Sequence, residues 1–262
     1  MVAETWSSGA NYESYVGRWS RLVAREFITW LAVSSAKRWL DVGCGSGALT
    51  QTILDVAQPD AVTSVDPSEG FLAYARATIT DPRTAFLAGD AQALPVESDA
   101  YDAVVSGLVL NFVPDPARAV DEMARATRSG GTVAVYVWDY AGEMQFMRYF
   151  WDAAAAVNPM ARELDEGSRF PVCHPEALER LFAAANLRDV TTRAIDIATN
   201  FRTFDDYWKP FLGGQGAAPS YLMALDTERR AAVRERIRAT LPTAPDGSIS
   251  LMARAWAARG SR

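Results

Sequence analysis

Residues Leu40–Thr50 read LDVGCGSGALT, in which three alternating glycines follow a short apolar run that ends in an acid. An apolar run that leads into a glycine loop is typical of a buried strand followed by a helix, and such turns commonly bind nucleotides. A triphosphate-binding loop carries a lysine behind its last glycine, whereas residues 41–50 contain neither lysine nor arginine. The stretch therefore predicts a strand–loop–helix unit of an α/β fold and argues against a kinase or ATPase.

The spacing of Gly43, Gly45 and Gly47 bears on which nucleotide the loop binds. A dinucleotide loop follows the pattern Gly-x-Gly-x-x-Gly and places a pyrophosphate at the helix N-terminus, but here one residue separates each glycine from the next. Asp41 precedes the loop, and its carboxylate repels a pyrophosphate and attracts a ligand that bears an ammonium or sulfonium charge. S-adenosylmethionine carries both charges and no phosphate. The loop favours this ligand, and a dinucleotide stays as an alternative.

The rest of the chain alternates apolar strands with amphipathic helices. Strands are expected at 37–42, 61–65, 84–88, 101–106, 132–138, 187–198 and 248–257. Helices are expected at 11–33, at about 48–56, behind Pro67-Ser68-Glu69, at 115–128 and at 175–185, with a sharp turn at Ser129-Gly130-Gly131. Two segments, 139–170 and 200–247, interrupt this rhythm. The pattern predicts a doubly wound, mostly parallel sheet whose last two strands close one edge as a hairpin.

Composition narrows the class of protein further. The 262 residues are 49% hydrophobic and 22% charged, which suits one large α/β domain with insertions or a domain and a half. No apolar run approaches the ~18 residues of a membrane span, and the N-terminus does not resemble a secretory signal. The two cysteines are far apart, so we expect no disulfide and a cytoplasmic location. The net charge of −6 argues against nucleic-acid and anionic-membrane partners.

Several motifs occur together and in order. They are LDVGCGSGALT at 40–50, Val65-Asp66, GDAQALP at 89–95, YDAVVS at 101–106 and RSGGT at 128–132. As a set, over about residues 36–138, they resemble the class I S-adenosylmethionine-dependent methyltransferases. Within that class the chain is similar to the small-molecule group that includes the ubiquinone and menaquinone methyltransferases.

The resemblance implies a Rossmann-like sheet of seven strands and a division of the chain. Residues 1–35 would form a helical cap over the cofactor, and 36–138 the cofactor-binding α/β core. Residues 139–262 would complete the sheet at about 174–199 and 248–258. They would also carry helical substrate-region insertions at about 139–170 and 200–247.

The resemblance also implies cofactor contacts. They are Tyr15, Arg18, Asp41, Gly43, Cys44, Gly45, Gly47, Asp66, Pro67, Asp90, Ala91 and Leu108. Asp41 would hold the ammonium side, and the backbone of Gly43 and Cys44 the aminocarboxypropyl arm. Asp66 would accept the ribose hydroxyls, Asp90 and Ala91 would bind adenine, and the backbone of Leu108 would lie near the methionine end. Tyr15 and Arg18, on one helical face, would line the cofactor, with Arg18 on its carboxylate; the alternative is a core tyrosine and a surface arginine.

Catalytic residues are harder to infer than cofactor residues. Methyl transfer from a sulfonium is an in-line displacement that needs mainly alignment, and a base only if the acceptor loses a proton. Asp139 and His174 are weak candidates for that base, and a turn and a helix start are the alternatives. Candidate residues of the acceptor pocket are Asn111, Trp138, Tyr140 and Trp208. We expect Cys44 to be a small loop residue and no metal to be bound.

The leading prediction is a methyltransferase that acts on an apolar or aromatic small molecule. A regulatory module that binds S-adenosylmethionine without turnover is one alternative, because no base stands out. An NAD-dependent oxidoreductase is the other. Turnover separates the first two, and binding of NADH would favour the third.

Overall fold

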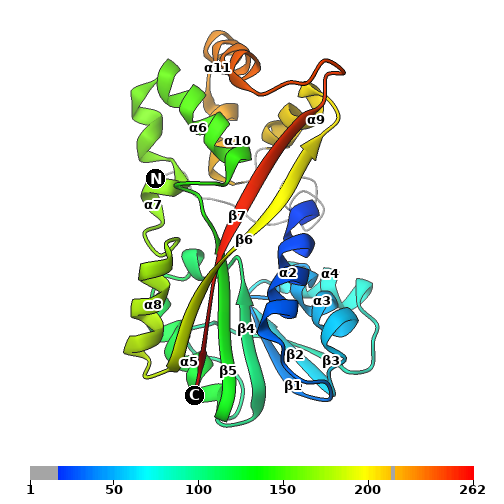
Figure 1. The fold of residues 1–262 in the computed structure, drawn as a ribbon. Coiled ribbons are helices and arrows are strands. Elements are labelled where there is room, and N and C mark those ends of the chain that lie inside the picture. The colour runs from blue at the N-terminus through cyan, green and yellow to red at the C-terminus, as the bar shows by residue number, and fades with distance from the viewer. Residues whose placement is uncertain (1–16, 214–215) are drawn as a thin grey trace. The chain divides into compact units, whose positions relative to one another are not determined.

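The computed structural model describes residues 17–213 and 216–262, which form the α/β fold that the sequence predicts (Figure 1). The strands are β1 (Arg38–Val42), β2 (Ala61–Asp66), β3 (Thr84–Ala88), β4 (Tyr101–Gly107), β5 (Thr127–Trp138), β6 (Arg188–Phe201) and β7 (Ile249–Ser261). They form one sheet in the order β3-β2-β1-β4-β5-β7-β6. The predicted seven-stranded, doubly wound sheet is confirmed.

Helices connect these strands. The longer ones are α2 (Arg18–Leu31), α3 (Ala48–Ala57), α4 (Glu69–Thr78), α5 (Pro116–Ala126), α6 (Gln145–Val157), α8 (Pro175–Ala184), α10 (Ala217–Ala224) and α11 (Thr227–Thr240). The short ones are η2 (Leu110–Phe112), η3 (Pro159–Glu163), α7 (Glu166–Arg169), α9 (Phe204–Trp208) and η4 (Lys209–Gly213). The chain divides into two compact units. We call residues 20–137, 172–195 and 255–262 the core unit, and residues 17–19, 138–171 and 196–254 the insert unit.

Five strands of the sheet, β3, β2, β1, β4 and β5, pair in parallel. The central strands β1 and β4 are almost continuously buried, as is usual where both faces of a parallel sheet are covered, and Trp39 and Val104 are fully buried. In this register Asp41 stands opposite Ser64 of β2 and Val105 of β4. Parallel strands bring their carboxyl ends to one edge, so the loops behind β1, β2 and β4 meet there.

Local signals explain where two of the helices begin. The Ser68 side chain caps α4 by accepting from the Phe71 N–H at 3.4 Å, and Pro67 stands just before this cap rather than inside the helix. The Asp115 side chain caps α5 in the same way, accepting from the Arg118 N–H at 3.0 Å, with Pro116 as the first helical residue. Both starts agree with ordinary capping chemistry.

The last two strands, β6 and β7, are antiparallel neighbours at one edge of the sheet, as predicted, although several helices lie between them in the chain. Along β5 and β7 the backbone N–H of Gly130 donates to the Arg262 carbonyl, and the N–H of Asp139, just after β5, donates to the Arg254 carbonyl. The residue numbers of β7 therefore fall as those of β5 rise. Strand β7 therefore runs antiparallel to β5 and lies between β5 and β6, which leaves β6 at the edge. Strand β6 also ends three residues later than predicted, at Phe201.

The predicted sharp turn at Ser129-Gly130-Gly131 is wrong, because these residues form a bulge inside β5. Tyr101 pairs with Thr127 and Ala103 with Thr132, so three extra residues of β5 are accommodated between the two pairs. Gly130 takes a φ of +74°, which a residue with a side chain rarely adopts. Helix α5 accordingly ends at Ala126 instead of continuing to 128.

Aromatic side chains form the interior of the insert unit. Phe146 and Phe150 of α6 stack on Phe211 with ring centroids 4.6 Å apart. The fully buried Tyr207 donates its hydroxyl hydrogen to the Phe146 carbonyl at 2.8 Å. The aromatic stretch at 201–211 therefore packs as core of this unit.

Candidate functional site

The first group of the candidate site is built around Asp41, one residue before the end of β1. Its side chain is fully buried, and its Oδ2 accepts the hydroxyl hydrogen of Thr50, from the first turn of α3, at 2.7 Å. The Thr50 Oγ1 lies 2.8 Å from the Ser64 Oγ. The other carboxylate oxygen, Oδ1, is buried and has no hydrogen-bond partner among the residues that the structure describes. A buried acceptor of this kind is a place for a ligand donor.

Asp66, the last residue of β2, fastens the glycine loop. Its Oδ2 accepts the Gly45 N–H and its Oδ1 accepts the Ser68 N–H, both at 2.9 Å. Burial raises the pKa of the Asp66 carboxyl, while these two backbone bonds lower it. Each carboxylate oxygen has a second lone pair. Asp66 can therefore accept further donors, such as a pair of hydroxyls, while it holds the loop.

The conformation of the glycine loop explains two of its glycines. Gly43 has a φ of +76°, and a Cβ there would lie 2.5 Å from a methyl carbon of Val109, so only glycine fits. Gly45 has a φ of +51°, but a Cβ there would meet open space. The loop is thus tightly packed at Gly43 and open at Gly45, which is a space that a ligand can fill. The N–H groups of Gly43 and Cys44 both donate to the Val65 carbonyl, so a ligand can meet only their carbonyl oxygens, and that of Cys44 already accepts the Gly47 N–H at 2.8 Å.

Burial dominates the electrostatics of this loop. It raises the pKa of Asp41 from its ordinary value of 3.8 to about 7, and the nearby charge of Asp66 adds to the effect, while the bond from Thr50 opposes it. Burial also raises the pKa of the Cys44 thiol, with Asp41 and Asp66 contributing. A protonated, buried thiol is a poor nucleophile, which agrees with the expectation that Cys44 is a loop residue.

The loop behind β3 carries Asp90 and Ala91, the predicted adenine contacts. The exposed Asp90 accepts the Gln92 N–H at 2.8 Å, which shapes the turn. Helix α5 holds the following residues, because Arg125 donates to the carbonyls of Leu94 and Val96. Glu122 joins this clamp: it accepts the Leu94 N–H at 2.9 Å and pairs with Arg125 at 2.8 Å. Sequence reasoning missed both residues, since an i, i+3 charge pair on a helix is ordinary.

The segment behind β4 is held in an unusual conformation. Leu108 has a φ of +62°, which is rare for a bulky residue and marks a strained position. Its N–H donates to the Tyr136 carbonyl at 2.8 Å. Val109 packs against Gly43, and Asn111 is buried with no hydrogen-bond partner for its Nδ2 within the described ranges. Val109 thus brings the segment behind β4 against the glycine loop, and the roles of Leu108 and Asn111 stay predictions.

Arg18 and Asp139 have partners of their own, whereas His174 is exposed. Tyr15 lies outside the described residues. Arg18, in the insert unit, pairs with Asp206 at 3.1 Å and lies over the ring of Trp19. Asp139 is buried, and its two carboxylate oxygens accept the N–H groups of Gly142 and Glu143, each at 3.0 Å. His174 is exposed and stands directly before α8. Asp139 and His174 thus occupy a turn and a helix start.

The remaining acceptor candidates belong to the insert unit. Trp138 is buried at the end of β5, and the Tyr140 ring lies 5.8 Å from that of Phe170. Trp208 packs against Phe204 and Phe211. Their role toward an acceptor stays a prediction.

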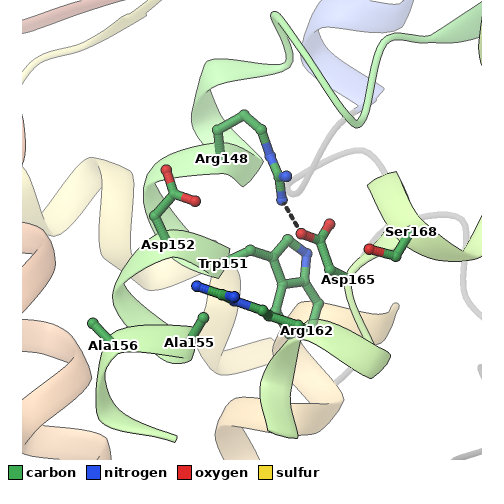
Figure 2. A pocket seen from close by; sticks show the side chains of 8 residues that line it. All are labelled: Arg148, Trp151, Asp152, Ala155, Ala156, Arg162, Asp165 and Ser168. Carbon is green, nitrogen blue, oxygen red and sulfur yellow. Dashed lines mark hydrogen bonds and ion pairs between the residues drawn. The ribbon is translucent and has the colours of Figure 1, made fainter. Parts of the chain in front are cut away.

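The insert unit also contains a pocket of about 430 Å³ that sequence reasoning did not find (Figure 2). One wall is a face of α6, and the other comes from η3, α7 and the residue before α7. The lining residues are Arg148, Trp151, Asp152, Ala155, Ala156, Arg162, Asp165 and Ser168. Arg148 pairs with Asp165 at 2.6 Å, and the Trp151 indole N–H donates to the buried Glu166. The only signal in the sequence is the helical spacing of the α6 residues, which is equally typical of a core face.

Comparison with known proteins relates the sheet and the glycine loop to a known protein family. Residues 40–135 match the family model described as a methyltransferase domain. Residues 40–135 are a methyltransferase domain. The stretch contains the glycine loop, Asp41, Asp66 and the segment behind β4. The expected class I methyltransferase fold is therefore confirmed, with this domain at its centre.

Relatives of the methyltransferase domain share part of their length with the chain. An uncharacterized methyltransferase of Mycobacterium bovis is 37% identical over 118 residues, which are 45% of this chain and 46% of the relative. A demethylmenaquinone methyltransferase of Roseiflexus castenholzii is 39% identical over 106 residues, 39% of this chain and 43% of the relative. The matches thus span less than half the length of these relatives.

A solved structure resembles the fold over most of the chain. The crystal structure of a putative methyltransferase from Bacillus halodurans superposes with a TM-score of 0.61 at 15% identity, covering 91% of this chain and 97% of that one. Among the described residues, no helix is long and apolar enough to cross a membrane. The same residues contain no group of three or more metal-ligating side chains placed to hold a metal ion.

Proposed function

We propose that this chain is an S-adenosylmethionine-dependent methyltransferase that methylates a small-molecule acceptor. The observation that carries the proposal is the loop of the methyltransferase domain. There a buried carboxylate oxygen of Asp41 lacks a partner, and Gly45 borders open space. These features fit a ligand with an ammonium group and no phosphate. A pyrophosphate would face two buried carboxylates, Asp41 and Asp66, which disfavours a dinucleotide.

The chain's own residues bind and orient. Asp41 offers Oδ1 to the ammonium group of the cofactor, and Asp66 keeps free lone pairs for the ribose hydroxyls while it holds Gly45. The clamp of Glu122 and Arg125 presents the loop at Asp90 and Ala91 to the adenine ring. When bound, S-adenosylmethionine supplies the methyl group on a sulfonium that is already a good leaving group. Alignment of the reactants is the protein's main contribution and can supply about 7–11 kcal/mol.

We assign no general base to Asp139 or His174. The two oxygens of Asp139 accept backbone hydrogens in a turn, and His174 is exposed at the start of α8. Asn111 is the better candidate for an acceptor contact, since its buried Nδ2 can donate to an acceptor oxygen. An aromatic acceptor is favoured by the name of the Roseiflexus relative, a demethylmenaquinone methyltransferase.

Isothermal titration with S-adenosylhomocysteine tests the cofactor, and binding in the micromolar range is the expected result. Absence of heat at millimolar ligand, or quenching of NADH fluorescence by the protein, would contradict the proposal. Turnover is then tested with S-adenosylmethionine and a panel of quinols, phenols, amines and thiols. A protein that binds the cofactor but methylates no member of the panel would instead support the regulatory module.

A further inference from the structure

A buried chain of hydroxyl groups lies behind Asp41. Thr50 and Ser64 are both fully buried; Thr50 donates to the Asp41 Oδ2 at 2.7 Å, and the Ser64 Oγ lies 2.8 Å from the Thr50 Oγ1. A hydroxyl carries one hydrogen. When Thr50 gives that hydrogen to the Asp41 carboxylate, Ser64 must donate its own to Thr50. The order of donation is then Ser64 to Thr50 to Asp41.

The hydrogen-bonded hydroxyls of Thr50 and Ser64 determine which oxygen of Asp41 is available to a ligand. Oδ2 is occupied by Thr50, whereas Oδ1 is buried without a partner within the described ranges. A buried acceptor that is left unsatisfied costs about 1–3 kcal/mol, which a ligand donor can recover. Thr50 lies in the first turn of α3, directly behind the glycine loop. The helix that begins at the loop therefore also sets the direction of the Asp41 carboxylate.

The hydroxyls of Thr50 and Ser64 can hydrogen-bond to Asp41 in both of its protonation states. A protonated carboxyl donates from Oδ2 to Thr50, and Thr50 then donates to Ser64. The direction of the two bonds reverses, and no member of the chain loses its bond. Among the titratable groups near this carboxyl, Asp66, at the end of β2, acts on its pKa, whereas Asp41 itself helps to raise the pKa of the Cys44 thiol in the loop. Burial and Asp66 raise the pKa of Asp41 to about 7, so its charge changes near neutral pH.

We propose that Thr50, supported by Ser64, is a positioning residue for Asp41 that couples cofactor binding to the release of a proton. The inference rests on the proposed function, because the ligand is S-adenosylmethionine or its product. The ammonium group of the ligand binds against Oδ1, and its charge favours the ionised carboxylate. The O–H bond of the protonated Asp41 breaks, the proton passes to solvent, and Thr50 turns its hydrogen toward the Oδ2 of the carboxylate.

Isothermal titration with S-adenosylhomocysteine in buffers of different ionisation enthalpy counts the released protons. We expect almost one proton at about pH 6, about half a proton at pH 7, and close to none at about pH 8.5. The Kd should rise about tenfold from pH 8 to pH 6, as linkage requires for a group that titrates near 7. Asp41→Asn should bind more weakly and release no proton.

Matched variants assign the effect to Thr50. Thr50→Val removes the bond to Asp41, so the midpoint of proton release should move to higher pH and the affinity at pH 7 should fall several-fold. Thr50→Ser keeps a hydroxyl and should restore the wild-type midpoint. Thr52→Val is the control, because Thr52 lies on the same helix and bonds to the Ala48 carbonyl instead. Circular dichroism checks that each variant is folded, and Thr50→Ala, which also lacks the hydroxyl, replaces Thr50→Val if that variant is not.

The outcomes separate this inference from the proposed function. If the ligand binds with an enthalpy that is the same in all buffers at pH 6 to 7, proton coupling is overturned while the cofactor assignment stands. Thr50→Val with the same proton release at every pH as Thr52→Val would overturn the role of Thr50, and so would Thr50→Ser with a midpoint displaced as far as that of Thr50→Val. Absence of binding in the wild-type protein would overturn both proposals together.

Discussion

The buried carboxyl of Asp41 serves ligand binding but lowers the stability of the ligand-free protein. A carboxyl with a folded pKa of about 7 and an ordinary value of 3.8 binds more protons in the folded state than in the unfolded state between these values. Stability contributed by this group is present below about pH 4 and is lost as the pH rises to about 7. The loss amounts to about 4 kcal/mol. Asp41 thus costs the ligand-free protein stability at the pH where it serves a cation.

Asp41→Asn should therefore change how the stability of the protein depends on pH. Because asparagine does not titrate, the unfolding free energy of the variant relative to wild type should rise between about pH 4 and pH 7. Urea unfolding at several pH values measures this difference. The amide side chain also changes the unfolding free energy by an amount that does not depend on pH. The slope of the free-energy difference with pH is therefore the quantity that reports on the pKa of Asp41. A difference that is the same at every pH would contradict the shifted pKa.

A comparison of Gly45 with Gly130 separates an effect on ligand binding from an effect on backbone conformation. Its φ is +51° and a Cβ would meet open space, and the same is true of Gly130, with a φ of +74°, in the bulge of β5. Gly45→Ala and Gly130→Ala should each cost about 1–2 kcal/mol of stability, because a left-handed backbone strains an L side chain.

Only Gly45→Ala should also weaken S-adenosylhomocysteine binding, by at least tenfold, since Gly130 lies far along the sheet from the loop. Thermal unfolding and isothermal titration of both variants make the comparison. Equal affinities in the two variants would show that the ligand does not approach Gly45.

At the scale of elements, the glycine loop depends on how its neighbours are fastened. Asp66 ties it to α4, and Val109, behind β4, fills the space beside Gly43. Helix α5 holds the loop behind β3 through Glu122 and Arg125. These contacts join segments that lie from about 20 to more than 60 residues apart in the chain. Parallel pairing of β1, β2 and β4 is what brings the segments to one edge.

Arg125→Met should loosen the loop that carries Asp90. The substitution removes hydrogen bonds to the Leu94 and Val96 carbonyls and leaves Glu122 without its cation. We expect a loss of about 1–3 kcal/mol of stability and a several-fold weaker affinity for S-adenosylhomocysteine. Hydrogen exchange should show faster amide exchange at 90–98. Arg83→Met, which breaks a half-buried pair with Asp81 outside this loop, is the control. Equal exchange at 90–98 in both variants would contradict the clamp.

At the scale of the whole molecule, a ligand that binds only the folded chain should protect it against unfolding. At about 100 times its Kd, S-adenosylhomocysteine should add about 2.7 kcal/mol. The two buried cysteines, Cys44 in the loop and Cys173 before α8, report where this protection acts. Single-cysteine variants, Cys44→Ser and Cys173→Ser, allow a thiol reagent to follow one site at a time.

Ligand should slow modification of Cys44 more strongly than that of Cys173 at low denaturant, where local opening dominates. The two rates should converge near the unfolding transition, where both thiols react through the globally unfolded chain. Equal protection of the two thiols at low denaturant would place the ligand away from the glycine loop.

Much of the site was predictable because its signals are local. The loop LDVGCGSGALT follows a strand and precedes a helix, and Asp66 ends the next strand, so both fall at the binding edge of any parallel sheet. Caps such as Ser68 and Asp115 lie within three residues of the groups they bond. The fold class followed from the alternation of strands and helices, which is written in short-range hydrophobic periodicity.

The other features of the fold and the site were determined by pairing between strands that are far apart in the sequence. Ser64 reaches Thr50 and Asp41 only because β1 and β2 pair in one particular register. The insertion of β7 between β5 and β6 and the bulge at Gly130 are likewise products of strand pairing, which leaves no local pattern. The sequence by itself thus determined the fold class and the edge of the sheet where a ligand binds. Only the tertiary structure decided which hydroxyls turn the Asp41 carboxylate toward that ligand, because hydrogen bonds between distant segments depend on packing and register.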